Sequence, residues 1–447
     1  MRPQVDNALL EGRPVRPLLR LALPFMAGNL LSLTVVIVDR LWVGRIGTES
    51  LAALGTAQVV LMVFGTLMMG MGIGTLAGVA RFTGAGRPEE AARYYGRGMV
   101  LSVGLGLFFA ALGATLPHHI IAFMGAKTDV AAPAIDYLAI SMYGLVFQAP
   151  LFVQSFALQG AGEARAALIV SAIAPAVNAA LDPLLIFGFD MGLPGAAWAS
   201  NAGYAVGVLT GSILLASGRL RLRPTRASFR RGEGTTRRII AVGVPGTVEH
   251  LVRTLASFSL VKIITVFGAA VVSAYTISLV VVMSLIYPGL AIGQAAATLM
   301  GQNLGAGRPD RAWSTAWIAV GLYLVLMIAA ALLLYTFAEP LIAAFDDNPE
   351  VIAEGAQLMR VQVLCFPTVA VALVLSKGFG GAGHTLPAMA SAATAHLAFQ
   401  IPAAWWFSRQ YGPVGAYGAM AGAYGVHAAI QVVLFTWRFH PRRYRPG

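Results

Sequence analysis

Long apolar stretches follow one another along the chain from Leu18 to Phe439, separated by short basic or glycine-rich breaks. Each stretch is close to the roughly 17–25 residues that a helix needs to cross the hydrocarbon core of a bilayer. A transmembrane β-barrel would instead show segments of about ten residues with alternating hydrophobicity, and these stretches do not alternate. The pattern therefore predicts an all-α polytopic membrane protein.

We predict twelve transmembrane helices. They lie at Leu18–Trp42, Leu51–Ala80, Tyr94–Leu116, Ala134–Leu158, Ala166–Gly188, Pro194–Ser217, Ile239–Phe267, Val272–Met300, Trp313–Phe337, Ala356–Phe379, Leu386–Arg409 and Pro413–Phe439. Only 11% of the residues are charged, against about 25% in soluble domains. The single cysteine, Cys365, lies in an apolar span, which excludes a disulfide framework. We also expect no cleavable signal, because no small-residue cleavage site follows a short apolar core near the N-terminus.

The formal net charge of +12 is unevenly distributed. With an even number of spans, both termini and alternate loops lie on one side, together with most of the basic residues. Those assigned to this side include Arg2, Arg81, Arg87, Arg97, Arg165, Arg231, Arg308, Lys377, Arg438, Arg443 and Arg445. The opposite loops hold only Arg45, Lys127, Arg360 and Arg409. By the positive-inside rule, both termini are expected in the cytoplasm, with the chain in a bacterial inner membrane. The basic excess then reflects topology and attraction to anionic lipids rather than nucleic-acid binding, for which no motif is present.

An internal repeat divides the chain. Gly84-Ala85-Gly86-Arg87-Pro88 recurs as Gly305-Ala306-Gly307-Arg308-Pro309, and Gly160-Ala161-Gly162 recurs as Gly381-Ala382-Gly383. Both recurrences have the same offset in sequence, which we call the repeat offset. Each copy holds six spans, so the copies have the same membrane orientation. We predict two homologous six-helix lobes, residues 1–220 and 239–447, related by a pseudo-two-fold axis along the membrane normal and joined by a basic cytoplasmic linker, residues 221–238. Such a repeat favours a transporter.

Three polar residues inside the spans of the first half are not copied by the repeat. Asp39 lies near the end of the first span, and Asn178 and Asp182 lie four residues apart on one face of the fifth. Their counterparts at the repeat offset are Leu260, Phe399 and Ala403. Ionisable groups inside spans are costly, so they are functional candidates.

This set of side chains suits a coupling cation. Two carboxyl groups close together in a poorly hydrated pocket can share a proton, and two ionised carboxylates with an amide oxygen can bind Na⁺. Pro183 leaves a backbone carbonyl without its helical partner. An alternative is that Asp39 only pairs with the adjacent Arg40.

A second polar patch lies on the seventh span, where Glu249, His250 and Arg253 follow one another closely. Glu249 and Arg253 are four apart, so one interpretation is an internal ion pair. The other is a second site for substrate or protons.

Enzyme motifs are absent from the chain. There is no Walker loop, no His-Glu-x-x-His metal helix, and no pair of aspartate-rich motifs that would hold a pyrophosphate through Mg²⁺. We therefore predict neither an enzyme nor a cofactor.

Several motifs in fixed order resemble the multidrug and toxic compound extrusion (MATE) family. They are Val38-Asp39-Arg40-Leu41-Trp42-Val43-Gly44, Leu158-Gln159-Gly160-Ala161-Gly162, Gly195-Ala196-Ala197-Trp198-Ala199, and Gly301-Gln302-Asn303-Leu304-Gly305-Ala306-Gly307-Arg308. The resemblance implies export of cationic, amphipathic, drug-like compounds against H⁺ or Na⁺ by alternating access. We expect the chain to function as a monomer, although the sequence does not determine its oligomeric state. Asn178 and Asp182 resemble the fifth-span pair of the DinF-like branch, and Ser200 stands where that branch offers a hydroxyl to the cation. The tenth span lacks the acidic residue that the NorM-like branch carries there.

Two other functions stay open from the sequence alone. One is a flippase for lipid-linked oligosaccharides from the same wider superfamily, although that function would call for basic residues in the first lobe. The other is a membrane scaffold that does not transport, although a scaffold does not need the uncopied carboxylates.

The topology yields a first prediction. A cysteine placed in the Gly218–Arg238 loop, for example by Ser228→Cys, should react with a membrane-impermeant maleimide only after the cells are opened, because the loop is expected in the cytoplasm. Labelling from outside intact cells would contradict the predicted orientation.

Overall fold

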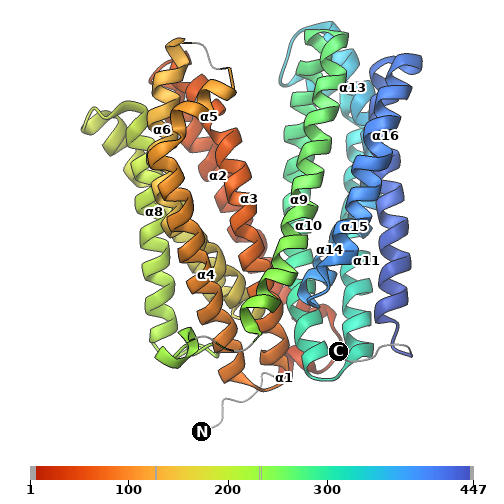
Figure 1. The fold of residues 1–447 in the computed structure, drawn as a ribbon. Coiled ribbons are helices and arrows are strands. Elements are labelled where there is room, and N and C mark those ends of the chain that lie inside the picture. Colours follow the sequence, from red (N-terminus) through yellow and green to blue (C-terminus); the bar gives the residue numbers. More distant parts are fainter. Residues whose placement is uncertain (1–6, 126–127, 231, 233, 443–447) are drawn as a thin grey trace. The chain divides into compact units, whose positions relative to one another are not determined.

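The structure is a computed structural model that describes residues 7–125, 128–230, 232 and 234–442. Within these ranges every regular element is helical (Figure 1). Five basic residues of the topology argument lie outside the described residues: Arg2, Lys127, Arg231, Arg443 and Arg445.

The helices follow the predicted order. The first half contains α1 (Asn7–Leu10), α2 (Val15–Gly44), α3 (Thr48–Gly84), α4 (Pro88–Thr115), α5 (Pro117–Phe123), α6 (Thr128–Gly160), α7 (Ala164–Pro183), the π-helical η1 (Leu184–Gly188) and α8 (Gly192–Ala216). The linker holds the short 3₁₀-helix η2 (Arg226–Phe229). The second half contains α9 (Thr235–Ile264), η3 (Thr265–Phe267), α10 (Ala269–Gly305), α11 (Pro309–Thr336), α12 (Ala338–Ala343), α13 (Pro349–Gln362), η4 (Val363–Cys365), α14 (Phe366–Gly381), α15 (Thr385–Ala392), the π-helical η5 (Ala393–Gln400) and α16 (Ile401–Phe439).

Eleven helical stretches in the described part of the chain are long and apolar enough to cross a membrane. The last of them, Thr385–Phe439, runs for 55 residues and contains two spans, because Gly412 interrupts it with a non-helical backbone at φ 64° and ψ −151°. Positive φ is readily adopted by glycine, so this residue can break the helix without strain. The predicted all-α architecture with twelve spans is therefore confirmed.

The element bounds repeat as the sequence does. α3 and α10 each have 37 residues, and their first residues, Thr48 and Ala269, are separated by the repeat offset. α4 and α11 each have 28 residues, and both begin with a proline at the first helical position, Pro88 and Pro309. The turns before them contain Gly86 and Gly307, at φ 68° and φ 69°. The repeated sequence thus specifies repeated turns and helix lengths.

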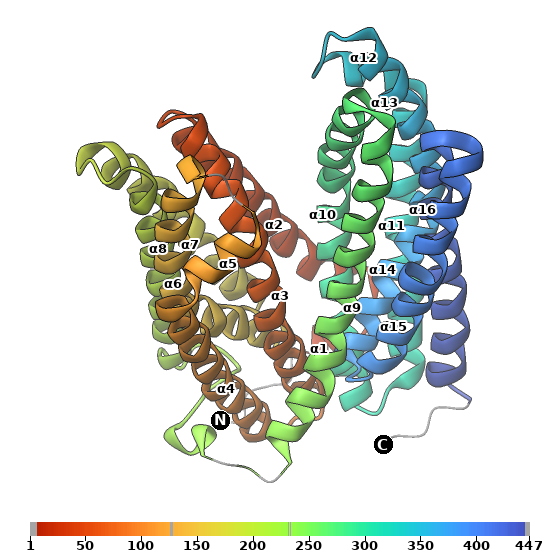
Figure 2. The same ribbon diagram turned by 45° about the horizontal axis from the view of Figure 1, so that its top comes forward.

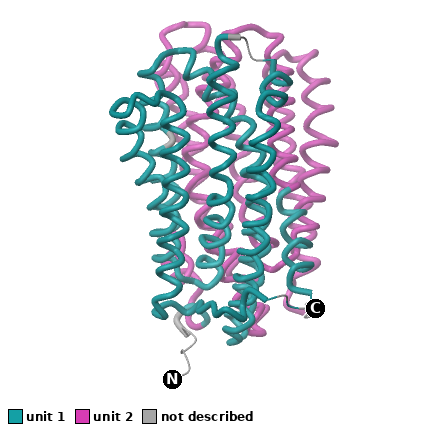
Figure 3. Tube along the Cα trace, turned by 60° about the vertical axis from the view of Figure 1, so that its left-hand side comes forward, with its two compact units in different colours: residues 1–10, 23–247 teal, residues 11–22, 248–447 magenta. Residues whose placement is uncertain are grey.

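The chain separates into two compact units (Figure 3). Unit 1 comprises residues 1–10 and 23–247, and unit 2 comprises residues 11–22 and 248–447. Each unit therefore takes its own set of long helices, apart from the opening turns of α2 and α9. The lobe boundaries predicted at residues 220 and 239 stay a prediction.

Within unit 1, α6 lies beside α3, α4 and α8, and α7 lies beside α8 (Figure 2). Within unit 2, α14 packs on α10, α11 and α16. Equivalent glycines permit close helix contacts in both units. A Cβ at Gly160 would lie 2.8 Å from the Leu76 carbonyl oxygen, and one at Gly381 would lie 2.0 Å from the Ala297 carbonyl oxygen. Leu76 and Ala297 are themselves counterparts at the repeat offset, so the repeat preserves the contact between backbones.

The linker turn refines the labelling experiment. Ser228 is buried, and its hydroxyl bonds the backbone and side chain of Thr225 in a capping box. The neighbouring Ala227 is exposed, so Ala227→Cys is the better probe for the same topology. Cys365 is buried, so the background labelling should be low.

The close helix contact generates a second prediction. Gly381→Ala should lower the melting temperature of the purified protein in detergent, because the new methyl group would overlap a carbonyl oxygen of α10. Overpacking of this kind costs about 1–3 kcal/mol. Gly321→Ala, at a helical glycine of α11 with nothing within 4 Å of its Cβ position, is the control and should leave the melting temperature unchanged or raised. Equal melting temperatures for the two variants would contradict the packing argument.

Candidate functional site

The four residues predicted to bind the coupling cation meet inside unit 1. Asp39 comes from α2, Asn178 and Asp182 from α7, and Ser200 from α8. The Asn178 amide nitrogen donates to Asp182 Oδ1 at 3.2 Å and to Ser200 Oγ at 3.1 Å. The carboxyl groups of Asp39 and Asp182 are within hydrogen-bonding reach of each other. We call these four residues the acidic site.

The carboxyl groups of the acidic site are deeply buried. Asp182 is fully buried, and Asp39 is 9% exposed. Asp39 Oδ1 and Asp182 Oδ2 are both buried and have no hydrogen-bond partner among the residues that the structure describes. Two carboxylates so close together, with unfilled acceptor positions and little water, repel each other unless a proton or a metal cation lies between them. The site therefore has the charge and the open ligands that a small cation requires.

Local backbone features hold α7 in place. Pro183 follows Asp182 directly and is the last residue of α7, and the π-helix Leu184–Gly188 begins after it. π-helical segments are rare and often occur at functional sites. On the other side of Asn178, a Cβ at Gly203 would lie 2.4 Å from the Ala174 carbonyl oxygen. The absent side chain lets α8 approach α7 closely enough for Ser200 to reach Asn178.

Arg40 acts electrostatically on Asp39 but also has a partner on another helix. Its guanidinium donates to Gln58 Oε1 at 3.3 Å, on α3. Asp39 makes no ion pair in the described part of the chain. Asp39 therefore interacts with Asp182 as well as with its neighbour in sequence, and the pairing with Arg40 stays an alternative.

Sequence reasoning missed two tyrosines beside the acidic site. Tyr137 of α6 and Tyr204 of α8 lie close enough to Asp39 to interact with it electrostatically, and Gln148 of α6 donates to the Tyr204 hydroxyl at 3.1 Å. The repeat carried the signal, since the counterparts of these three residues are apolar: Leu358, Gly425 and Val369. Extending the comparison between halves from ionisable to all polar residues would have found them.

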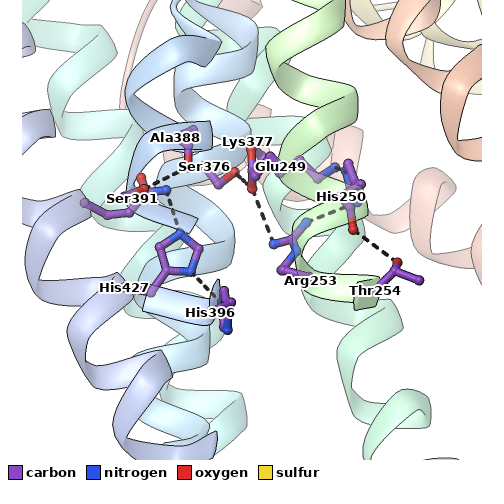
Figure 4. Close-up of polar contacts among 11 residues, drawn as sticks. Glu249, His250, Arg253, Thr254, Ser376, Lys377, Ala388, Ser391, His396 and His427 are labelled. Atoms are coloured by element: carbon purple, nitrogen blue, oxygen red, sulfur yellow. Dashed lines mark hydrogen bonds and ion pairs between the residues drawn. The ribbon is translucent and has the colours of Figure 1, made fainter. Parts of the chain in front are cut away.

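The second polar patch lies inside unit 2 and is larger than predicted. The predicted ion pair exists, with Arg253 Nη1 3.4 Å from Glu249 Oε1. The Ser376 hydroxyl of α14 also donates to Glu249 Oε1. His250 Nδ1 lies 3.1 Å from Arg253 Nη2, and His250 Nε2 lies 3.4 Å from Lys377 Nζ (Figure 4). We call Glu249, His250, Arg253, Ser376 and Lys377 the basic cluster.

The structure adds a contact to Lys377, which the sequence analysis counted with the basic residues of the cytoplasmic side. The structure places Lys377 within α14, where its ammonium group faces α9 in the basic cluster. The loop begins only after Gly381, so the lysine is one helical turn inside the span. Its ammonium group therefore takes part in the basic cluster, and its assignment to the cytoplasmic side stays a prediction.

A buried pair of histidines lies next to the basic cluster. His396 Nε2 of η5 lies 3.3 Å from His427 Nδ1 of α16 (Figure 4). Their other ring nitrogens face Gln400 Oε1 at 2.8 Å and Gln431 Nε2 at 3.2 Å. The imidazoles thus join the eleventh span to the twelfth, and every ring nitrogen has a neighbour.

Comparison with known families matches the chain twice to one model. The MatE family model matches residues 24–184 and residues 245–406. The starts of the two matched segments are separated by the repeat offset, so the family model and the internal repeat divide the chain in the same way.

Curated relatives cover most of the chain. The probable multidrug resistance protein YpnP of Bacillus subtilis is 24% identical over 91% of each chain. The FAD transporter of Shewanella oneidensis is 25% identical over 77% of each chain. The probable multidrug resistance protein NorM of Thermotoga maritima is 24% identical over 94% of this chain and 92% of its own.

Solved structures share the fold. A transporter of the MOP superfamily from Pyrococcus furiosus superposes with a TM-score of 0.88 at 24% identity, over 96% of both chains. A MATE crystal structure in the bent conformation superposes with a TM-score of 0.89 at 24% identity, over 98% of this chain and 97% of the other. Members of the family are transporters and not enzymes. The family model matches most of the chain in two copies, and the solved structures share its two-lobe fold. The chain therefore belongs to the MatE family of multidrug and toxic compound extrusion transporters.

Proposed function

We propose that this MATE transporter exports organic, often cationic and amphipathic compounds by exchange with H⁺ or Na⁺, and that the acidic site binds the coupling ion. The observation that carries this proposal is the proximity of Asp39 and Asp182, each with a buried carboxylate oxygen that has no partner among the described residues. Asn178 orients the pair, because its amide nitrogen holds both Asp182 and Ser200.

Either ion satisfies the site in its own way. A proton shared by the two carboxyl groups removes one of two adjacent negative charges. Na⁺ instead accepts oxygen ligands, which Asp39, Asp182 and the Ser200 hydroxyl supply, together with the amide oxygen of Asn178. In both cases the ion replaces a repulsion between Asp39 and Asp182 with an attraction, so the contact of α2 with α7 is stronger when the ion is bound.

Exchange follows from this dependence on the ion. Coupling between two ligands is reciprocal, so an ion that stabilises one arrangement of the helices must weaken the binding of any compound that prefers the other. Pro24 of α2 and Pro175 of α7 lie inside their helices, and a proline removes a helical hydrogen bond. We propose that these points bend when the acidic site changes its occupancy.

The setting of this function is also a proposal. Two of the relatives above are named for multidrug resistance and one for FAD transport. We assign the chain to drug-like substrates, to the DinF-like branch, and to the bacterial inner membrane as a monomer among anionic lipids, with both termini in the cytoplasm.

The coupling role generates a third prediction. Asp182→Asn keeps the volume and polarity of the side chain but removes its charge, so gradient-driven efflux of a fluorescent organic cation should fall to the level of protein-free liposomes. Asp39→Asn should act in the same way. The measurement uses proteoliposomes in which a pH gradient and a Na⁺ gradient are imposed separately, which also identifies the ion.

Asp136→Asn is the matched control. Asp136 is exposed on α6 of the same unit, so its substitution should leave efflux unchanged at equal reconstitution. If Asp182→Asn and Asp39→Asn both retain wild-type efflux, the ion binds elsewhere, and Glu249 with His250 becomes the better candidate.

A further inference from the structure

The basic cluster contains more cations and hydrogen-bond donors than it can satisfy internally. Arg253 and Lys377 bring two positive charges, and Glu249 is the carboxylate that acts electrostatically on Lys377 among the described residues. Glu249 Oε1 is already shared by Arg253 and Ser376. A surplus cation inside a span is costly unless an anion accompanies it.

His250 shows the same shortage of acceptors. One ring nitrogen faces Arg253 Nη2 and the other faces Lys377 Nζ. Both neighbours are donors only, whereas a neutral imidazole has a single acceptor nitrogen. In one of the two contacts, therefore, two donors face each other. The Arg253 or Lys377 group in that contact needs an acceptor from outside the cluster.

The cluster is also a departure from the repeat. The counterparts of Glu249, His250, Arg253 and Lys377 in the first half are Gly28, Asn29, Ser32 and Phe156. A six-helix half thus folds without any of these charges. The cluster is not fully enclosed by the described residues, because the Arg253 side chain is 23% exposed.

From these observations we propose that the basic cluster binds an oxyanion, the carboxylate or phosphate of an amphipathic substrate. Arg253 and Lys377 bind its oxygens, and His250 orients both donors. The inference rests on the proposed function and narrows it: the substrates of this exporter include zwitterionic and anionic compounds. Lys377 is the residue that discriminates, because Arg253 is already paired with Glu249.

The experiment compares two forms of one rhodamine dye, the ethyl ester and the free carboxylate. The two share a chromophore and differ only in the anionic group. Binding of each to the purified full-length protein in detergent is measured by fluorescence anisotropy, without any ion gradient. Lys377→Gln should weaken binding of the carboxylate dye roughly tenfold or more, the loss expected when a buried charge pair loses one partner. Binding of the ester should change less than about twofold.

Two variants complete the comparison. Lys377→Arg keeps the charge and should retain discrimination in favour of the carboxylate dye. Lys262→Gln removes an exposed lysine of α9 outside the cluster and should leave both affinities unchanged. An equal effect of Lys377→Gln on both dyes, or no effect on either, would overturn the proposal. If Lys377→Gln does not fold, the wild-type protein still tests the proposal. Tighter binding of the ester dye than of the carboxylate dye to the wild-type protein would overturn it.

A competition arm separates the two sources of such an anion. Phosphatidylglycerol added to the micelles should displace the carboxylate dye from the wild-type protein if a lipid phosphate enters the cluster, and should leave it bound if only solutes do. Both outcomes support an oxyanion site. Because no gradient is applied, failure of ion coupling at the acidic site leaves this result unaffected. Intact gradient-driven efflux without discrimination between the two dyes would refute the oxyanion site and leave the proposed function standing.

Discussion

The hydrocarbon interior of a membrane offers no hydrogen-bond partner, and the rest of this structure depends on that constraint. The backbone satisfies it by forming helices throughout the spans. Hydroxyl side chains satisfy it locally, as when Thr75 Oγ1 donates to the Met71 carbonyl oxygen at 2.7 Å and Thr315 Oγ1 to the Arg311 carbonyl oxygen at 2.7 Å. A carboxylate or an ammonium group has no such local solution. Charged side chains from different helices therefore cluster together. Each such cluster marks a place where the requirements of folding alone do not explain which residues are present.

Duplication makes those places recognisable. Two halves with the same helix lengths and the same turn glycines provide an internal control for one another, so a charge that only one half carries is not required by the fold. By this criterion unit 1 has acquired the acidic site and unit 2 the basic cluster, in regions where the other half is apolar or neutral. The halves have kept one scaffold and diverged in the sign of their buried charge.

Much of this could be predicted from the sequence, for physical reasons that differ from residue to residue. Span length and the constant repeat offset indicated the twelve helices, because both are periodic features of the chain. Asp39, Asn178 and Asp182 stood out because a charge or amide within an apolar stretch is conspicuous, whereas Ser200 came only from the family resemblance. Tyr204 was missed because a tyrosine in an apolar span is usually interpreted as a packing residue of the core. The direction of the Lys377 ammonium group could not be predicted, because it depends on a contact with His250, which lies far away in the sequence.

The opposite charges of the two sites bear on the energetics of exchange. When a monovalent coupling ion enters in exchange for a substrate that is a monocation, no net charge crosses the membrane. The same ion exchanged for a zwitterion, whose anionic group is neutralised in the basic cluster, moves one positive charge inward. Such a step gains about 2.3 kcal/mol for each 100 mV of inside-negative potential. If the basic cluster selects zwitterions as proposed, the membrane potential therefore adds to the ion gradient as a driving force for their export, because a zwitterion carries no net charge outward.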